Sequence, residues 1–193
     1  MPAIPEKYTL SFTPNFEDKT FVAQSRIDIS IPADEEIDQI QLDSGDLKID
    51  FTGFYWAEHI FRGNPNYIGY RTMETIENGV MTLPLPNKFN ASLIAEGGYV
   101  EVKHKGSMEM DGLKFEDGIL ETHFENNNGK LVFPNFEGTP AITQLFINVP
   151  NDTKIEVGDN LIRDTDYEED GVVKYHSNGE KIMVSDVYFK IFA

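Results

Sequence analysis

The chain has 193 residues and a formal net charge of −17, which would repel phosphate backbones and anionic membrane surfaces, so we expect neither nucleic-acid nor membrane binding. It contains no cysteine, which excludes disulfides, cysteine-ligated metals and thiol catalysis. Its 14 phenylalanines and 8 tyrosines favour strands over helices, and its length suits one β-domain over residues 1–193 better than two small domains.

The N-terminal residues 1–6 lack the basic start and apolar run of a signal peptide, and no segment is long and apolar enough to span a bilayer. We therefore expect a soluble, cytoplasmic protein. The acidity fits either of two explanations, which are solubility at high concentration and attraction for a basic or amine-bearing partner.

Period-two alternation predicts the strands of the N-terminal half, with residues 7–12 and 20–31 forming a hairpin. Residues 56–70 are less regular and include a turn at 63–66. The Asn78-Gly79 pair predicts a hairpin that ends at Pro84, Pro86 and Asn87, and residues 89–96 suggest one short helical turn. The remaining strands expected in this half are 37–42, 47–55, 72–75, 80–85 and 99–104.

The C-terminal half continues the strand pattern. Residues 108–118 are expected to form a loop or an edge hairpin, and residues 164–171 an acidic loop without the spacing of a calcium-binding loop. A turn is expected at 177–180. The predicted strands are 142–149, 154–157, 172–176 and 182–192.

The stretch from residue 121 to 146 has the most constrained backbone of the chain. Pro134 and Pro140 fix φ on either side of Gly138, so the chain must turn sharply there. The neighbouring side chains need a core to enter; they are Leu131, Val132, Phe133 and Phe136.

This stretch resembles a known signature. Residues 122–125 (T-H-F-E), 133–137 (F-P-N-F-E) and 140–141 (P-A) are similar to the T-Q-F-E…F-P-C-[FW]-D-E-P-A pattern of the N-terminal β-domain of gluzincin-type zinc aminopeptidases, which include aminopeptidase N, puromycin-sensitive aminopeptidase and leukotriene hydrolase. The first hairpin also matches that family, at Pro5, Tyr8, Leu10, Pro14, Phe16 and Phe21. The resemblance implies an all-β fold, an antiparallel β-sandwich or saddle-like stack of sheets.

The family binds zinc through H-E-x-x-H in the domain that follows this one, where the two histidines hold the metal and the glutamate activates water. None of the four histidines here, at 59, 104, 123 and 176, lies in such a motif. The resemblance therefore implies a non-catalytic relative, with no metal site, no cofactor and no peptidase activity of the family type.

In the family, the glutamate of T-Q-F-E helps to hold the free amino group of the substrate. Glu125 occupies that position and His123 replaces the glutamine, so these two residues are the candidate amine-binding site. The arginines that commonly follow are replaced by residues 126–130 (N-N-N-G-K), and one residue is inserted within 136–140. The alternative is that Glu125 and His123 are ordinary loop residues.

We expect a protein-interaction or self-associating module, in which a homodimer or a docked protein partner replaces the catalytic domain against which this domain packs in the family. Three alternatives stay open. They are a peptide or free-amine binder that uses Glu125, an excised fragment of a larger zinc aminopeptidase, and a hydrolase with a site of another type.

Overall fold

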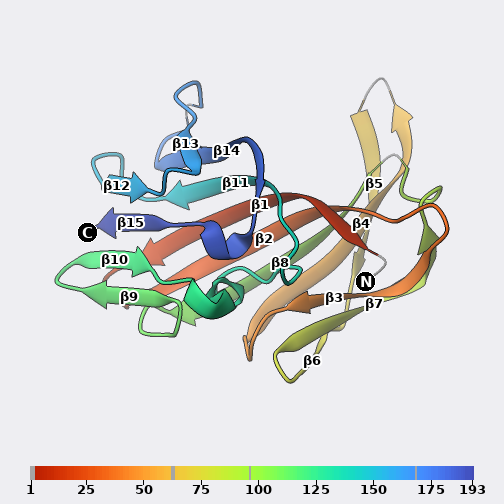
Figure 1. The fold of residues 1–193 in the computed structure, drawn as a ribbon, viewed down its shortest axis with the longest axis horizontal. Coiled ribbons are helices and arrows are strands. Elements are labelled where there is room, and N and C mark those ends of the chain that lie inside the picture. Colours follow the sequence, from red (N-terminus) through yellow and green to blue (C-terminus); the bar gives the residue numbers. More distant parts are fainter. Residues whose placement is uncertain (1–2, 62–63, 96, 168) are drawn as a thin grey trace.

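The computed structural model describes residues 3–61, 64–95, 97–167 and 169–193 (Figure 1). Within these residues the chain forms three β-sheets and two short 3-10 helices, so the all-β prediction is confirmed. Across the same described ranges, no helix is long and apolar enough to cross a membrane.

The largest sheet has eight strands in the order β13-β14-β11-β1-β2-β8-β4-β5. Its neighbouring strands are antiparallel except β1 and β11, which pair in parallel from Lys7↔Ile142 to Phe12↔Ile147. The strands of this sheet are β1 Ile4–Asn15, β2 Thr20–Ser30, β4 Ile49–Phe61, β5 Asn64–Arg71, β8 Gly98–Ser107, β11 Ala141–Asn148, β13 Leu161–Arg163 and β14 Val172–Ile182.

Two smaller antiparallel sheets complete the fold. The four-stranded sheet has the order β12-β15-β10-β9, and the three-stranded sheet has the order β3-β7-β6. Their strands are β3 Glu36–Asp43, β6 Thr75–Glu77, β7 Val80–Asn90, β9 Leu113–Glu116, β10 Ile119–Thr122, β12 Lys154–Val157 and β15 Phe189–Phe192, and the two helices are η1 Glu125–Leu131 and η2 Val184–Asp186.

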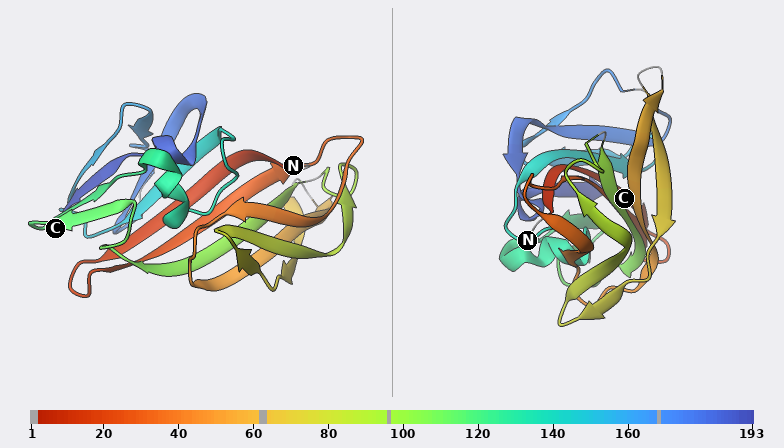
Figure 2. Two further views of the ribbon diagram at one scale, coloured as in Figure 1. Left: turned by 60° about the horizontal axis from the view of Figure 1, so that its bottom comes forward. Right: turned by 90° about the vertical axis from the view of Figure 1, so that its right-hand side faces the viewer.

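Both small sheets pack against the large sheet, the four-stranded one near one end and the three-stranded one near the other (Figures 1 and 2). Phe12 of β1 lies 5.1 Å from Phe189 of β15, and Phe54 of β4 lies 4.9 Å from Phe89 of β7, between ring centroids. Along β2, buried and partly exposed residues alternate, so one face of the large sheet enters the core and the other meets solvent. This arrangement is the layered sheet stack that the sequence predicted.

The predicted sharp turn is present at Gly138, whose φ of +62° is the left-handed conformation that glycine adopts readily. The Thr139 N–H donates to Phe136 O at 3.2 Å across this turn. Tyr8, fully buried on β1, holds the segment because its hydroxyl donates to Thr139 O and accepts from the Phe136 N–H, both at 3.3 Å. We call residues 132–140 the central turn.

Hydrogen bonds to Asp43 and His104 also hold the central turn in place. Asn135 and Asp43 of β3 exchange backbone hydrogen bonds of 2.8 and 3.0 Å, and the Asn135 side chain donates to Phe133 O at 2.9 Å. On the other side, His104 of β8 is fully buried, and its Nε2 lies 2.8 Å from Val132 O. The central turn is thus joined to both the large and the three-stranded sheet.

Several local predictions were wrong. Two strands have other bounds than expected: β6 is Thr75–Glu77 where 72–75 was predicted, and the strand predicted at 182–192 is interrupted by η2 before β15 begins at Phe189. The strand expected at 47–55 continues as β4 to Phe61, and Asn64–Asn66, expected in a turn, begin β5; residue 63 lies outside the described residues. β7 passes through Pro84 and Pro86 because they lie where its pairing with β3 shifts register, a position that does not need their missing N–H groups. Within the stretch 89–96, expected to form one helical turn, β7 continues to Asn90. The turn itself follows at residues 91–95, where the Ile94 N–H donates to Asn90 O at 3.4 Å, the i to i+4 bond of a helical turn.

Another error concerns residues 177–180, where a turn was expected but β14 continues to Ile182. The pairing of β11 with β14 jumps from Gln144↔His176 to Ile142↔Lys181, so these residues form a bulge. Gly179 there has a φ of +74°, which explains the turn-like sequence. The edge hairpin allowed at 108–118 is present as the pair β9–β10.

Replacing Tyr8 by phenylalanine should lower the free energy of unfolding by about 1–2 kcal/mol, because it leaves the buried Phe136 N–H and the Thr139 carbonyl without their partner. Urea denaturation followed by intrinsic fluorescence would measure the loss. The matched control is Tyr70→Phe, whose ring is 39% exposed. Equal stability of the two variants would show that the hydroxyl does not hold the central turn.

Stability should also depend on the protonation of His104, because burial lowers its pKa below the ordinary value of 6.5. The unfolded chain then binds a proton more readily than the folded one, so stability is full above about pH 6.5 and is lost as the pH falls toward the folded-state pKa. Urea denaturation at several pH values between 7.5 and 5 should show this loss, and His104→Gln should reduce it. An unchanged pH profile in the variant would contradict the assignment.

Candidate functional site

The two predicted site residues line one pocket. His123 directly follows β10 and Glu125 is the first residue of η1, and both side chains are exposed. The pocket has a volume of about 340 Å³ and also includes residues 109–112 of the loop between β8 and β9 and residues 113–114 at the start of β9. We call it the His123 pocket. The structure therefore brings the two residues together on one surface.

The His123 pocket contains more carboxylates than cations. Glu109, Asp111 and Glu125 line it, together with Lys114. Lys114 lies 2.7 Å from Glu116, so its charge is compensated outside the pocket. Glu109 is 3.0 Å from Lys19. Glu109 and Asp111 were not predicted, because the site prediction was carried over from a motif that does not include them.

The backbone of the His123 pocket requires a glycine at residue 112. The His123 N–H donates to Gly112 O at 2.8 Å. Gly112 has a φ of +90°, and a Cβ added there would lie 2.9 Å from the carbonyl oxygen of Asn128 in η1. The 108–112 loop can therefore approach η1 this closely only because glycine at residue 112 has no side chain.

A hydrogen-bonded pair of side chains lies beside the pocket. The Tyr188 hydroxyl donates to Glu121 at 2.5 Å, and this bond raises the pKa of Tyr188 to about 12. The same bond lowers the pKa of Glu121, and Lys190 at 3.7 Å acts in the same direction. His123 Nε2 lies 4.0 Å from the second Glu121 oxygen. Tyr188 is far from His123 in the sequence, and no motif pointed to it.

A second surface of functional interest lies on the solvent-facing side of the large sheet. Four side chains cross β5, β4, β8 and β2 there, and we call them the aromatic strip: Tyr67, Tyr55, Tyr99 and Arg26. The Tyr55 and Tyr99 rings stack at 4.6 Å between centroids, with planes 11° apart. The Tyr67 ring meets Tyr99 edge-on at 5.1 Å, and the Arg26 guanidinium carbon lies 3.7 Å from the Tyr99 centroid.

Two glycines make room for the aromatic strip. A Cβ on Gly69 would lie 2.6 Å from the Tyr55 ring, and one on Gly53 would lie 2.9 Å from it. Tyr55 and Tyr99 are directly opposed in the β4–β8 pair, so their stacking also stabilises the sheet. The strip could not be predicted from the sequence, because its members lie on four separate strands and come together only through the strand order of the sheet.

A groove continues from the aromatic strip at the end of β5. It has a volume of about 570 Å³, and its apolar lining includes Phe51 and Met73, the latter 83% exposed. Arg71 also lines it, and its guanidinium carbon lies 5.6 Å from the Phe51 centroid. The groove and the strip together form one surface, since the Phe51 and Tyr55 rings both lie over Gly53.

Within the described ranges, no group of three or more His, Asp or Glu side chains could hold a metal ion. His104 is buried, His123 lines its pocket and His176 lies on β14, while the side chain of His59 is outside the described part. In the acidic loop, Asp164 pairs with Lys174 at 2.9 Å. Two other carboxylates there accept hydrogen bonds from neighbours: Asp170 from Asn151 and Glu169 from Tyr167.

The chain matches a family model. Residues 4–146 match the model described as the peptidase M1 N-terminal domain, a range that includes both candidate site residues and the central turn. No curated protein matches the chain.

Solved structures of M1 zinc metallopeptidases share the fold along nearly the whole chain. The Deinococcus radiodurans enzyme aligns with a TM-score of 0.70 at 13% identity, covering 99% of this chain and 42% of that chain. A mutant two-domain M1 enzyme bound to L-tryptophan gives the same TM-score at 13% identity, with 99% and 43% coverage. A D. radiodurans mutant bound to a Tyr-Ser-Ala substrate also scores 0.70, at 14% identity, with 99% and 42% coverage. The chain thus spans less than half the length of these structures.

Proposed function

Because the chain belongs to the peptidase M1 N-terminal domain family, we propose that it acts as a non-catalytic protein-interaction module, binding either a protein partner or a second copy of itself. The chain contains no H-E-x-x-H sequence, and the solved relatives extend well beyond the part that it matches. Binding to a partner or a second copy would therefore take place on the surfaces of this domain.

The observation that carries the proposal is the composition of the aromatic strip and its groove. Tyrosine, arginine, phenylalanine and methionine are the residue types enriched in protein interfaces, and tyrosine and arginine contribute many of the strongest contacts. Here they gather on one side of the large sheet, with Tyr67 36% and Met73 83% exposed. A contiguous exposed surface of this kind favours burial against another protein.

The charges around the strip are balanced in spite of the strongly acidic chain. Arg26 lies 3.0 Å from Asp28, and Lys103 lies 3.1 Å from Glu101. These pairs reduce the contribution of the strip to the self-repulsion that a net charge of −17 causes. This favours the strip as the part of the surface where a second copy or an acidic partner can approach.

The proposal predicts that the double variant Tyr67→Ser/Met73→Ser loses association without losing its fold. Light scattering over a range of concentrations should show a dimer for the natural chain and a monomer for the variant, since both side chains are exposed and contribute little to the core. Ile162→Ser, 42% exposed on β13, is the matched control and should stay dimeric.

If the natural chain is monomeric, a photo-crosslinking amino acid at position 67 distinguishes a partner from no interaction. Crosslinks in native extract that disappear in Met73→Ser would support a separate protein partner. A monomer with no strip-dependent crosslink would contradict the proposal.

A second candidate function is binding of a peptide through its free amino group at Glu125 and His123. The observation that favours it is the presence of Glu109 and Asp111 in the same pocket, because clustered carboxylates attract an ammonium group. The Glu125 position corresponds to the glutamate of the family signature. A Tyr-Ser-Ala substrate is bound by one of the solved M1 structures, and this ligand suggests the peptide length to test.

Titration with Tyr-Ser-Ala peptide should show binding that falls by roughly tenfold or more in Glu125→Gln, the change expected when one charge-assisted hydrogen bond is lost. Glu77→Gln on β6, an exposed position, is the control and should bind normally. Isothermal titration calorimetry would measure the affinities. Equal binding of the N-acetylated peptide would show that the amino group is not recognised.

A further inference from the structure

The outer edge of β3 offers a binding surface separate from the aromatic strip and the His123 pocket. β3 is the terminal strand of the three-stranded sheet and pairs with β7 on its inner side. On the outer side, the Asp43 N–H donates to Asn135 O at 2.8 Å and the Asn135 N–H donates to Asp43 O at 3.0 Å. Asn135 thus occupies one antiparallel bridge position at the C-terminal end of this edge.

The edge continues past that bridge without a partner. In an antiparallel strand, alternate residues direct both backbone groups to the same side. Because Asp43 faces outward, Gln41 and Gln39 also face outward, while Ile40 and Leu42 face β7. Pro84, which has no N–H, stands opposite Gln39 and agrees with this assignment. In the part of the chain that the structure describes, no backbone group bonds to Gln39 or Gln41 from the outer side.

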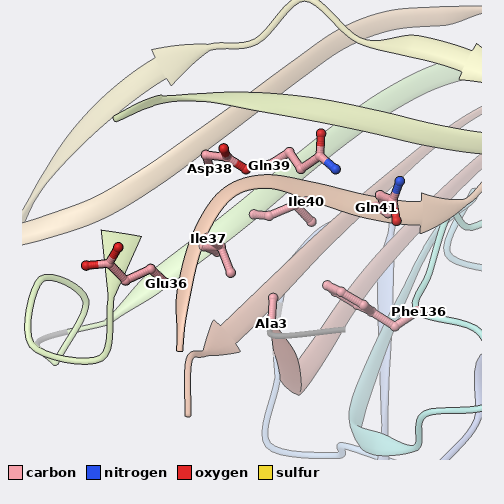
Figure 3. A pocket seen from close by; sticks show the side chains of 8 residues that line it. All are labelled: Ala3, Glu36, Ile37, Asp38, Gln39, Ile40, Gln41 and Phe136. Carbon is pink, nitrogen blue, oxygen red and sulfur yellow. The ribbon is translucent and has the colours of Figure 1, made fainter. Parts of the chain in front are cut away.

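A groove runs along this edge (Figure 3). It has a volume of about 330 Å³ and is lined by residues 36–41 together with Ala3 and Phe136. The apolar side chains Ile37, Ile40, Ala3 and Phe136 are buried at its base, each 6% exposed or less. In Figure 3, Asp38 and Gln39 point away from Ala3 and Phe136. The groove therefore combines an apolar base with unused backbone donors and acceptors.

The surroundings of the groove are acidic. Glu36 and Asp38 lie on β3, and Asp34 and Glu35 lie in the loop before it, all exposed. Lys88 pairs with this cluster: its Nζ is 4.0 Å from Glu36, and both side chains are more than half exposed. A surface pair of this kind neutralises little of the cluster.

We propose that the outer edge of β3 binds an extended, cationic segment of a partner protein as an added strand. Backbone hydrogen bonds to Gln39 and Gln41 supply affinity, small apolar side chains enter the groove toward Phe136, and lysine or arginine side chains meet Glu36 and Asp38. The bridge between Asp43 and Asn135 indicates the antiparallel register for the added strand. A second copy of the chain is disfavoured as the occupant, because its own β3 edge carries the same negative charge.

The test uses the full chain and a capped peptide of alternating lysine and valine, seven residues long, in low salt. Amide hydrogen exchange followed by NMR should show fast exchange at Gln39 and Gln41 and slow exchange at Ile40 and Leu42 in the free chain. Addition of the peptide should slow exchange at Gln39 and Gln41 and shift resonances of residues 36–41, whereas a glutamate–valine peptide should do neither.

Two variants make the result specific. Asp38→Lys reverses one charge at the groove and should lower the affinity for the lysine–valine peptide by roughly tenfold at low salt. The control is Glu180→Lys, which reverses an exposed charge on β14 and should leave this affinity unchanged. Gln41→Pro removes an outward N–H and should abolish binding.

Three outcomes would overturn the proposal. The first is slow exchange at Gln39 and Gln41 in the free chain that becomes fast on dilution, which would assign the edge to a second copy. The second is peptide-induced resonance shifts that occur only outside residues 36–41. The third is the absence of binding at millimolar peptide. None of these outcomes changes the expectations for the aromatic strip, because the two surfaces share no residue.

Discussion

The structure depends on the hydroxyl of Tyr8, which receives a hydrogen bond from Phe136 and donates one to Thr139 inside the core. Through it the central turn is fixed to β1, while Asn135 fixes the same turn to β3 and His104 fixes its start to β8. Buried polar groups are costly unless they are paired, so these bonds allow a non-repetitive segment to lie between two sheets. The β3 edge lies next to this segment, since Asn135 bridges Asp43 and Phe136 lines the groove along β3.

Much of the fold could be predicted from the sequence because half-buried strands leave a period-two pattern. The central turn was predictable for a different reason: two prolines and Gly138 permit few backbone conformations. The errors occurred where local signals have two structural explanations. Pro84 and residues 177–180 resemble strand ends, yet both lie at shifts in strand register, which depend on a distant partner strand. Strand β13, three residues long, has too short a pattern to be recognised.

The candidate surfaces were predictable only where their residues are close together in the sequence. His123 and Glu125 are two positions apart and line the same pocket. The other carboxylates of that pocket come from the loop before β9, and the Tyr188–Glu121 pair joins β10 to the segment before β15. The aromatic strip needs four strands in a specific order, and that order is a property of the sheet. Burial and pairing of the backbone therefore determine these sites more than any local motif does.

The parallel pairing of β1 with β11 has a consequence for how the molecule is assembled. β1, which is synthesised long before β11, lies in the middle of the large sheet, and Tyr8 contacts Thr139 across a separation of 131 residues. Contacts between residues so far apart in the sequence slow folding, because a long loop must close before they form. During synthesis, the edge of β1 that pairs with β11 stays unpaired until β11 has left the ribosome, even if the hairpin of β1 and β2 has already formed. The net charge of −17 bears on that interval, since charge repulsion between nascent chains would oppose edge-to-edge aggregation.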